Sequence, residues 1–147
     1  MAQMYVKRTL SGFDPVDEPS REAHHRFRLG HIYRADIVKP RNYKHHCLCL
    51  ALLSLTFENQ ERYTLFKDFR DAVAIEAGHV ETFVALSGEC LRRPKSISYD
   101  AIPDDIEFGR VMSAMMQVCS VILGGMDLYE LQAEVSKYAL THYGVSA

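Results

Sequence analysis

Apolar residues alternate with polar ones in two segments near the start of the chain. The alternation covers residues 4–10 and residues 29–38, with Ile32 and Ile37 as candidate core positions of the second segment. Such alternation is typical of a strand with one buried face. Pro40 follows the second segment and should end it, because proline lacks the N–H that a strand donates to its neighbour. We therefore predict two strands here.

Between these two segments the pattern is interrupted by turn-forming residues. Residues 11–20 contain Gly12, Pro15 and Pro19, which favour a loop. Residues 21–28 are largely charged and indicate a short helical turn.

The middle of the chain has the apolar spacing of helices. A nearly all-apolar segment follows Asn42, a favoured N-cap residue, and predicts a helix that is buried on most sides. Residues 61–73 then place Tyr63, Phe66 and Val73 on one face and charged residues on the other. This pattern predicts a second, amphipathic helix.

Residues 79–98 return to the spacing of strands. Residues 79–86 alternate, Ser87 and Gly88 favour a turn, and residues 91–98 run back, which together predict a hairpin.

Two further helices are predicted beyond the hairpin. Pro103 suits the first turn of a helix, and the apolar residues that follow it have helical spacing. This core stripe consists of Phe108, Met112, Met115, Cys119 and Ile122. Gly124 and Gly125 should end that helix, and Asp127 should cap the last one, with Glu130 three residues further on.

These elements predict a single α+β domain over residues 1–147, with small β-hairpin or sheet elements packed on about four helices. Apolar runs fall short of the roughly 18 to 20 residues that a membrane span needs, and residues 1–10 lack the apolar stretch of a signal peptide. We therefore expect a cytoplasmic protein with no membrane partner. Cys47 and Cys119 fall on apolar helix faces, which favours reduced, buried thiols.

Charge is unevenly distributed along the chain, although the net charge is only −2. Residues 1–46 carry nine Lys or Arg against five Asp or Glu, a balance of +4, and residues 47–147 carry eight against fourteen, a balance of −6. A basic third followed by an acidic remainder can orient a nucleic acid or an acidic partner. Ordinary surface variation is the alternative explanation.

Two clusters of basic residues are candidate nucleic-acid-binding sites. One lies at the start of the buried helix, where free N–H groups and the helix dipole favour an anion, and its members are Arg41, Lys44, His45 and His46. The other lies in the returning arm of the hairpin, and its members are Arg92, Arg93 and Lys95. Such cations can contact phosphates, with Tyr43 or Tyr99 stacking on bases. A solvated, charged surface is the alternative for both clusters.

A third polar cluster consists of Glu76, His79 and Glu81. His79 and Glu81 share one face of the predicted strand, where a carboxylate and an imidazole could hold Mg²⁺ or act as acid and base. A structural hydrogen-bond network is the more frequent use of such a cluster. Zinc-type ligand spacing is absent at residues 45–49, so we expect no metal or other cofactor.

Several motifs occur in an order that carries a resemblance. They are Arg41-Asn42 followed by His46 and by ALL at 51–53, IEAGH at 75–79, PKSIS at 94–98 and DIEF at 105–108. In these motifs, which span about residues 30–135, the chain resembles an uncharacterised phage and prophage family typified by YdfU. The resemblance implies a phage protein that acts in the cytoplasm of a bacterial host.

The order of the predicted elements is also similar to that of the NinB/Orf recombination mediators of lambdoid phages. That resemblance implies binding of single-stranded DNA, cooperation with the host single-strand binding protein, and a homodimer. One departure is that Cys47 and Leu48 stand where these relatives place basic residues, which removes two expected phosphate contacts. Met112, Met115 and Met116 could face either a second copy or the core.

The leading hypothesis is a non-enzymatic, phage-encoded DNA-binding accessory protein of recombination or replication, without catalytic residues. The alternative is a protein-binding inhibitor of a host system, such as an anti-defence factor, whose acidic C-terminal two-thirds imitates the charge of a nucleic acid. A third hypothesis is a metal-dependent nuclease that uses Glu76, His79 and Glu81.

Overall fold

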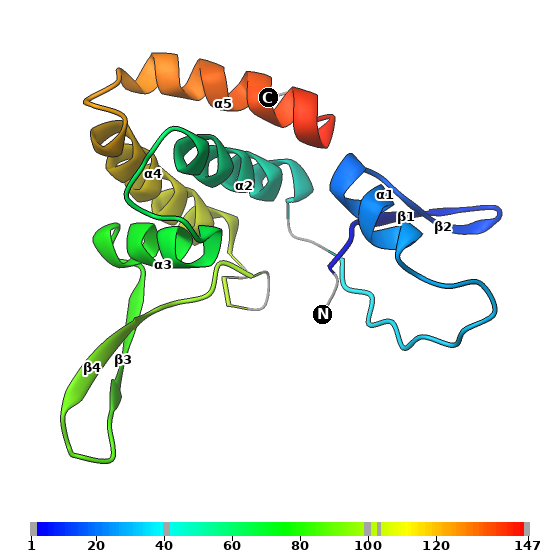
Figure 1. Cartoon of the computed structure of the whole chain (residues 1–147), viewed down its shortest axis with the longest axis horizontal. Helices are drawn as coiled ribbons and strands as arrows, with labels where there is room; N and C mark the ends of the chain where they lie inside the picture. The colour runs from blue at the N-terminus through cyan, green and yellow to red at the C-terminus, as the bar shows by residue number, and fades with distance from the viewer. Residues whose placement is uncertain (1–2, 40–41, 99–100, 103, 146–147) are drawn as a thin grey trace.

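A computed structural model describes residues 3–39, 42–98, 101–102 and 104–145 of the chain. Within these residues it has five helices and two antiparallel sheets of two strands each, which confirms the predicted α+β class. The helices between residues 43 and 143 gather into one body, the helix of residues 18–25 lies at its side, and the two hairpins project at different places (Figure 1). Across the same residues, no helix combines the length and the apolar character that crossing a membrane requires.

The body is organised around α2 (Tyr43–Glu58), which contacts α5 (Leu128–Tyr143), α4 (Asp105–Ile122) and α3 (Phe66–Glu76). As predicted, α2 begins after Asn42, whose side chain accepts a hydrogen bond from the backbone N–H of His45 at 3.0 Å. Neighbours on several sides explain why the helix is apolar nearly all round. Its fully buried apolar residues are Cys47, Cys49, Ala51, Leu52 and Leu53.

The predicted core stripe of α4 is confirmed for four of its five members, since Phe108, Met112, Met115 and Cys119 are buried. Ile122 is 40 % exposed, because it lies in the last turn of α4, where the helix borders a cleft. Asp127 caps α5 by accepting hydrogen bonds from the N–H groups of Tyr129 and Glu130, as expected. Leu131 and Val135 of α5 are buried in the same core.

The predicted hairpin is confirmed as β3 (Val80–Val84) and β4 (Cys90–Pro94). It follows α3 after only three residues, because Gly78 adopts a positive φ of 78° that reverses the chain at the helix end. The helix α3 itself begins later than the predicted range of 61–73, since residues 61–65 form a connecting loop.

The loop predicted over residues 11–20 is wrong. This segment holds β2 (Gly12–Pro15), which pairs with β1 (Val6–Thr9), and the first residues of α1 (Glu18–His25). Pro19 stands in the first turn of α1, where its missing N–H costs no hydrogen bond. Asp17 is the N-cap and accepts a hydrogen bond from the N–H of Ser20 at 2.9 Å.

The strand predicted over residues 29–38 is also wrong, because this segment forms no regular element. Ile32 is 99 % exposed and Ile37 is 60 % exposed, so neither is a core residue. Alternation makes a strand only where a second strand is available for pairing. Within the described residues, each sheet consists of one two-stranded hairpin, and residues 29–38 pair with neither of them.

Candidate nucleic-acid interface

The basic residues of β4 lie on a hairpin that extends away from the helical body (Figure 1). Its strands pair Glu81 with Arg93 and Thr82 with Arg92. Neighbouring residues of a strand point to opposite faces, so Arg92 and Arg93 occupy different faces of the hairpin. Both side chains are exposed. The structure therefore brings two of the predicted cations together on one projecting element, one on each face.

Arg93 is oriented by two neighbours on its own face. Its Nε donates to a carboxylate oxygen of Glu81 at 2.7 Å, and its guanidinium lies 5.1 Å from the centre of the Phe83 ring. Surface pairs of this kind contribute little to stability, but they hold a long side chain in one orientation. Glu81 is thus a partner of Arg93 and is not aimed at His79 in the way that a metal site would require.

The base of the hairpin is fixed by His79, which is only 8 % exposed. Its Nε2 lies 3.0 Å from the carbonyl oxygen of Ser96 and donates a hydrogen bond to it. The backbone carbonyl of His79 accepts a hydrogen bond from the N–H of Lys95 at 3.0 Å. This set of bonds joins the end of α3 to the residues that leave β4, and it leaves Lys95 partly buried at the base.

The three members of the predicted Glu76, His79 and Glu81 cluster therefore have separate surroundings. Glu76 lines a cleft, His79 bonds to a backbone carbonyl, and Glu81 pairs with Arg93. Among the residues that the structure describes, no group of three or more His, Cys, Asp and Glu side chains is close enough to hold a metal ion.

The far end of the hairpin carries apolar residues that sequence reasoning did not single out. Leu86 is 111 % exposed in the turn, Val84 is 71 % exposed and Phe83 is 37 % exposed. Turns favour Gly, Pro, Asn, Asp and Ser, so a leucine beside Ser87 and Gly88 is the sequence signal that could have drawn attention to this position.

The basic start of α2 is more enclosed than its sequence indicates. His46 is 8 % exposed and lies between the Tyr5 and Phe108 rings, whose centres are 6.0 Å and 6.1 Å away. His45 is partly exposed and packs edge-on against Phe108 at 4.8 Å. Lys44 is exposed, and Arg41 lies outside the described residues. The packing leaves Lys44 and part of His45 as surface groups at this helix start.

Tyr43 is held by a polar contact with the N-terminal region. Its hydroxyl donates to Asp17, which is 3 % exposed, and its ring packs edge-on against Tyr5 at 4.7 Å. Burial, and then hydrogen bonds to Asp17 and Cys47, raise the pKa of the Tyr43 phenol above its ordinary value. Tyr43 therefore connects two parts of the protein, and Tyr99, the other stacking candidate, lies outside the described residues.

The cysteines divide between the body and the hairpin, and all four are free. Cys47, Cys49 and Cys119 are buried, as predicted for the first and the last, whereas Cys90 is exposed on β4. Burial raises the pKa of the Cys47 and Cys119 thiols to about 11. These two thiols are therefore protonated at neutral pH. Met112 and Met115 are in the same core, so only Met116 of the methionine group is partly exposed.

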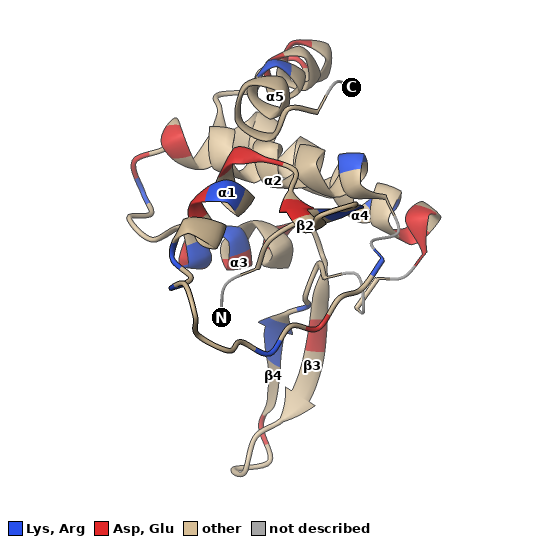
Figure 2. Ribbon diagram, turned by 90° about the vertical axis from the view of Figure 1, so that its right-hand side faces the viewer, with Lys and Arg blue, Asp and Glu red and all other residues tan. Residues whose placement is uncertain are grey.

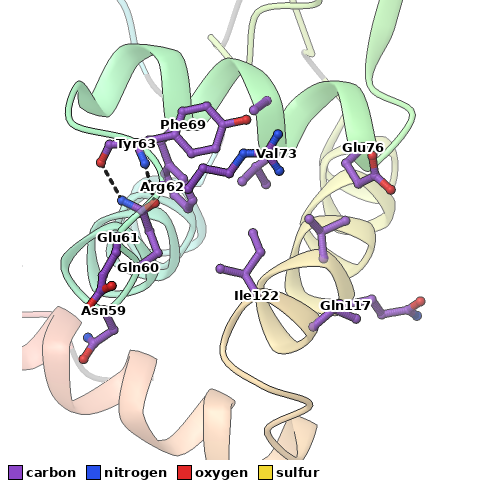
Figure 3. Close-up of a pocket in the computed structure, with 13 residues that line it drawn as sticks. Asn59, Gln60, Glu61, Arg62, Tyr63, Phe69, Val73, Glu76, Gln117 and Ile122 are labelled. Atoms are coloured by element: carbon purple, nitrogen blue, oxygen red, sulfur yellow. Dashed lines mark hydrogen bonds between the residues drawn. The ribbon is translucent and has the colours of Figure 1, made fainter.

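A cleft of about 790 Å³ lies between the loop after α2, the helix α3 and the last turns of α4 (Figure 3). Phe69, Val73 and Ile122 form part of its apolar lining, and Glu61 and Glu76 stand at opposite ends of it. The Gln60 side chain secures the loop by bonding to the backbone N–H and C=O of Tyr63. Residues 59–76 and 117–122, two segments far apart in the sequence, form this cleft, so no local pattern could predict it.

Charges of both signs are interspersed on the side of the molecule that carries α1 (Figure 2). Arg21 of α1 pairs with Glu18 at 2.9 Å, and Arg34 pairs with Asp36 at 3.4 Å. The basic balance of residues 1–46 is therefore partly neutralised by neighbouring carboxylates. Arg92 and Arg93 of β4 form a separate basic position on the hairpin (Figure 2).

Comparison with protein-family models, curated proteins and solved structures found no match to this chain.

Proposed function

We propose that this protein is a phage-encoded, non-enzymatic accessory protein of recombination or replication that binds DNA, with single-stranded DNA as the preferred form. The observation that carries the proposal is the β3–β4 hairpin, which presents the exposed side chains of Arg92 and Arg93 away from the helical body.

The hairpin has the chemical groups that single-strand binding needs. Guanidinium groups bind phosphate oxygens through several N–H donors, and an aromatic face provides a platform for a base. Arg92, Arg93 and Phe83 supply these groups within two neighbouring strands. Lys44 and His45, at the start of α2, are a second cationic position in the proposal.

The motif resemblance to the phage and prophage family supports the phage context. From the start of α2 onward, the order of elements is similar to that of the NinB/Orf mediators, and this similarity supports a single-stranded ligand, a host protein partner and a homodimer. In the host cell, such a protein would act in the cytoplasm, where the DNA lies.

Fluorescence anisotropy with labelled single-stranded and duplex oligonucleotides, at about 50 and 200 mM salt, tests the proposal. We expect binding that weakens steeply with salt, because each neutralised phosphate releases counterions. Arg92→Ala/Arg93→Ala should reduce the slope of log K against log salt by about 1.4, at about 0.7 for each lost contact to a single strand.

Arg92→Ala alone leaves the Arg93–Glu81 pair in place and should reduce the slope of log K against log salt by about half as much as the double variant. Lys67→Ala/Lys137→Ala is the matched control, because it removes two exposed cations from α3 and α5. Absent or salt-independent binding by the unmodified protein would rule out the proposal.

The cleft beside α3 favours a second candidate function, which is binding of a host protein. Its apolar lining and the carboxylates of Glu61 and Glu76 suit an amphipathic helix with apolar anchors and flanking lysines. A labelled synthetic peptide of that kind is the probe. Glu61→Lys/Glu76→Lys should weaken its binding about tenfold, whereas Glu130→Lys/Glu134→Lys on α5 should leave the affinity unchanged. Equal affinity for all three proteins would exclude the cleft as the site.

A further inference from the structure

We propose that the β3–β4 hairpin recognises the junction between single-stranded and double-stranded DNA, with Leu86 stacked on the last base pair. This inference rests on the proposed function and specifies its substrate. Three features of the hairpin carry it: the apolar apex, the placement of one cation on each face, and the carboxylate beside the apex.

The apex is a defined turn and not an irregular loop. The N–H of Ala85 donates to the carbonyl of Glu89 at 2.8 Å, and the N–H of Gly88 donates to the carbonyl of Ala85 at 2.9 Å. Gly88 has a φ of 85°, the left-handed conformation that closes a three-residue hairpin loop. Leu86 therefore stands at a fixed position, fully exposed, at the outermost point of the element.

A branched apolar side chain in such a place matches the flat, apolar face of a base pair. Proteins that open or kink a duplex insert Leu, Ile, Met, Phe or Pro against base steps. A terminal base pair at a junction exposes one face, so stacking there avoids the cost of separating two stacked pairs. Val84 and Phe83 extend the apolar surface below the apex.

The two arginines are arranged for two strands that diverge. Arg92 shares a face with Thr82, and Arg93 shares the opposite face with Glu81 and Phe83. A single strand meets both of them only if it crosses from one face of the hairpin to the other. At a junction the two backbones separate to either side of the hairpin, and each face then offers one guanidinium.

The spacing along the hairpin agrees with this arrangement. Arg92 is opposite Thr82, four residues before Leu86, which corresponds to about 13 Å at about 3.3 Å per residue. The cations thus lie behind the apex, where the separated backbones would pass. Glu89 lies beside the apex and repels phosphates from it, which leaves the apex to the uncharged base pair.

The test uses a forked duplex with 2-aminopurine in the terminal pair, together with the blunt duplex and the single strand of the same sequence. We expect the protein to bind the fork about tenfold more tightly than either control, since burying the exposed Leu86 side chain against a base pair contributes about that factor. The 2-aminopurine emission should change on binding, because Leu86 covers the exposed face of that base and shields it from water.

Leu86→Ala should lose the preference for the fork and the emission change, while its binding to the single strand stays within about twofold. Leu10→Ala is the matched control, since Leu10 is equally exposed at the turn of the β1–β2 hairpin. Both residues are solvent-exposed, so circular dichroism should show unchanged folding.

The outcomes separate this inference from the proposed function. If the protein binds DNA but Leu86→Ala behaves like the unmodified protein, or if Leu10→Ala removes the fork preference instead, the junction inference is wrong and DNA binding stands. If the unmodified protein binds none of the three DNAs, both proposals are wrong.

Discussion

The two hairpins are alike at their ends and different at their bases. Each is an antiparallel pair of short strands with a fully exposed leucine in its turn, Leu10 in one and Leu86 in the other. The β1–β2 hairpin is attached through buried polar side chains, whereas the β3–β4 hairpin continues directly from α3. The comparison teaches that residues at the base hold each hairpin in place, whereas residues near the turn are free to bind a ligand.

The base of β1–β2 is a small network around Asp17. One carboxylate oxygen accepts from the N–H of Ser20, the other accepts from the Tyr43 hydroxyl, and the N–H of Tyr5 donates to the Ser20 hydroxyl at 2.7 Å. The base of β3–β4 relies mainly on backbone bonds and on a single buried side chain, His79. We therefore expect substitutions at the first base to be the more destabilising.

The largest effect is expected for Asp17→Ala. This change removes the N-cap of α1 and leaves the half-buried Tyr43 hydroxyl without its acceptor, so it should lower the free energy of unfolding by about 3 kcal/mol. Urea denaturation followed by circular dichroism measures the loss. Asp14→Ala, at an exposed position of β2, is the control and should stay within about 0.5 kcal/mol. Equal losses would show that Asp17 does not anchor the hairpin.

His79→Ala should have a smaller effect and lower the free energy of unfolding by about 1 to 2 kcal/mol, because one hydrogen bond and a buried ring are lost. His79→Gln keeps a donor and should recover part of the stability. Glu81→Ala should change the unfolding free energy by less than about 0.5 kcal/mol, since its pair with Arg93 is exposed. A loss for His79→Ala as large as that for Asp17→Ala would contradict the comparison.

The smallest expected effect is the loss of stability that the ionisation of Tyr43 causes at alkaline pH. The raised pKa of Tyr43 favours the protonated phenol in the folded state, so its contribution is complete below the unfolded pKa of about 10 and is lost as pH rises above it. Between pH 9 and 11 the free energy of unfolding of the unmodified protein should fall by about 1 kcal/mol more than that of Tyr43→Phe. This difference is reduced because the ring is only partly buried.

Both proteins should also lose stability over this range for a shared reason, since the buried Cys47 and Cys119 thiols have raised pKa values. Because Tyr43 hydrogen-bonds to Cys47, the difference between the urea midpoints of the two proteins reports the phenol together with its effect on this thiol. Identical pH profiles would mean that Tyr43 ionises as easily in the folded state as in the unfolded one.

The sequence predicts the elements whose signals are local. Asn42 and Asp127 mark the starts of α2 and α5, and Ser87 with Gly88 marks the turn between β3 and β4. The prediction fails where a local signal has two meanings. Prolines and glycine at residues 12–19 indicated a loop, but Pro19 suits a first helical turn equally well.

Local sequence patterns predict only part of the candidate site. Arg92 and Arg93 were found from their charge, and their placement on opposite faces follows from the period of a strand. The enclosure of His46 by Tyr5 and Phe108 depends on contacts between distant segments, which no local pattern records. The cleft beside α3 was missed for the same reason.

The packing of α5 on α2 has a consequence for biosynthesis. The Tyr138 hydroxyl bonds to Glu58 at 2.7 Å across 80 positions of the chain. At about 5 to 20 residues per second, a ribosome needs roughly 4 to 16 s to make that interval. During this time the apolar α2 has already emerged but lacks its covering helix. The nascent chain is therefore most prone to aggregate just before α5 appears, and a chaperone that acts in that interval would protect α2.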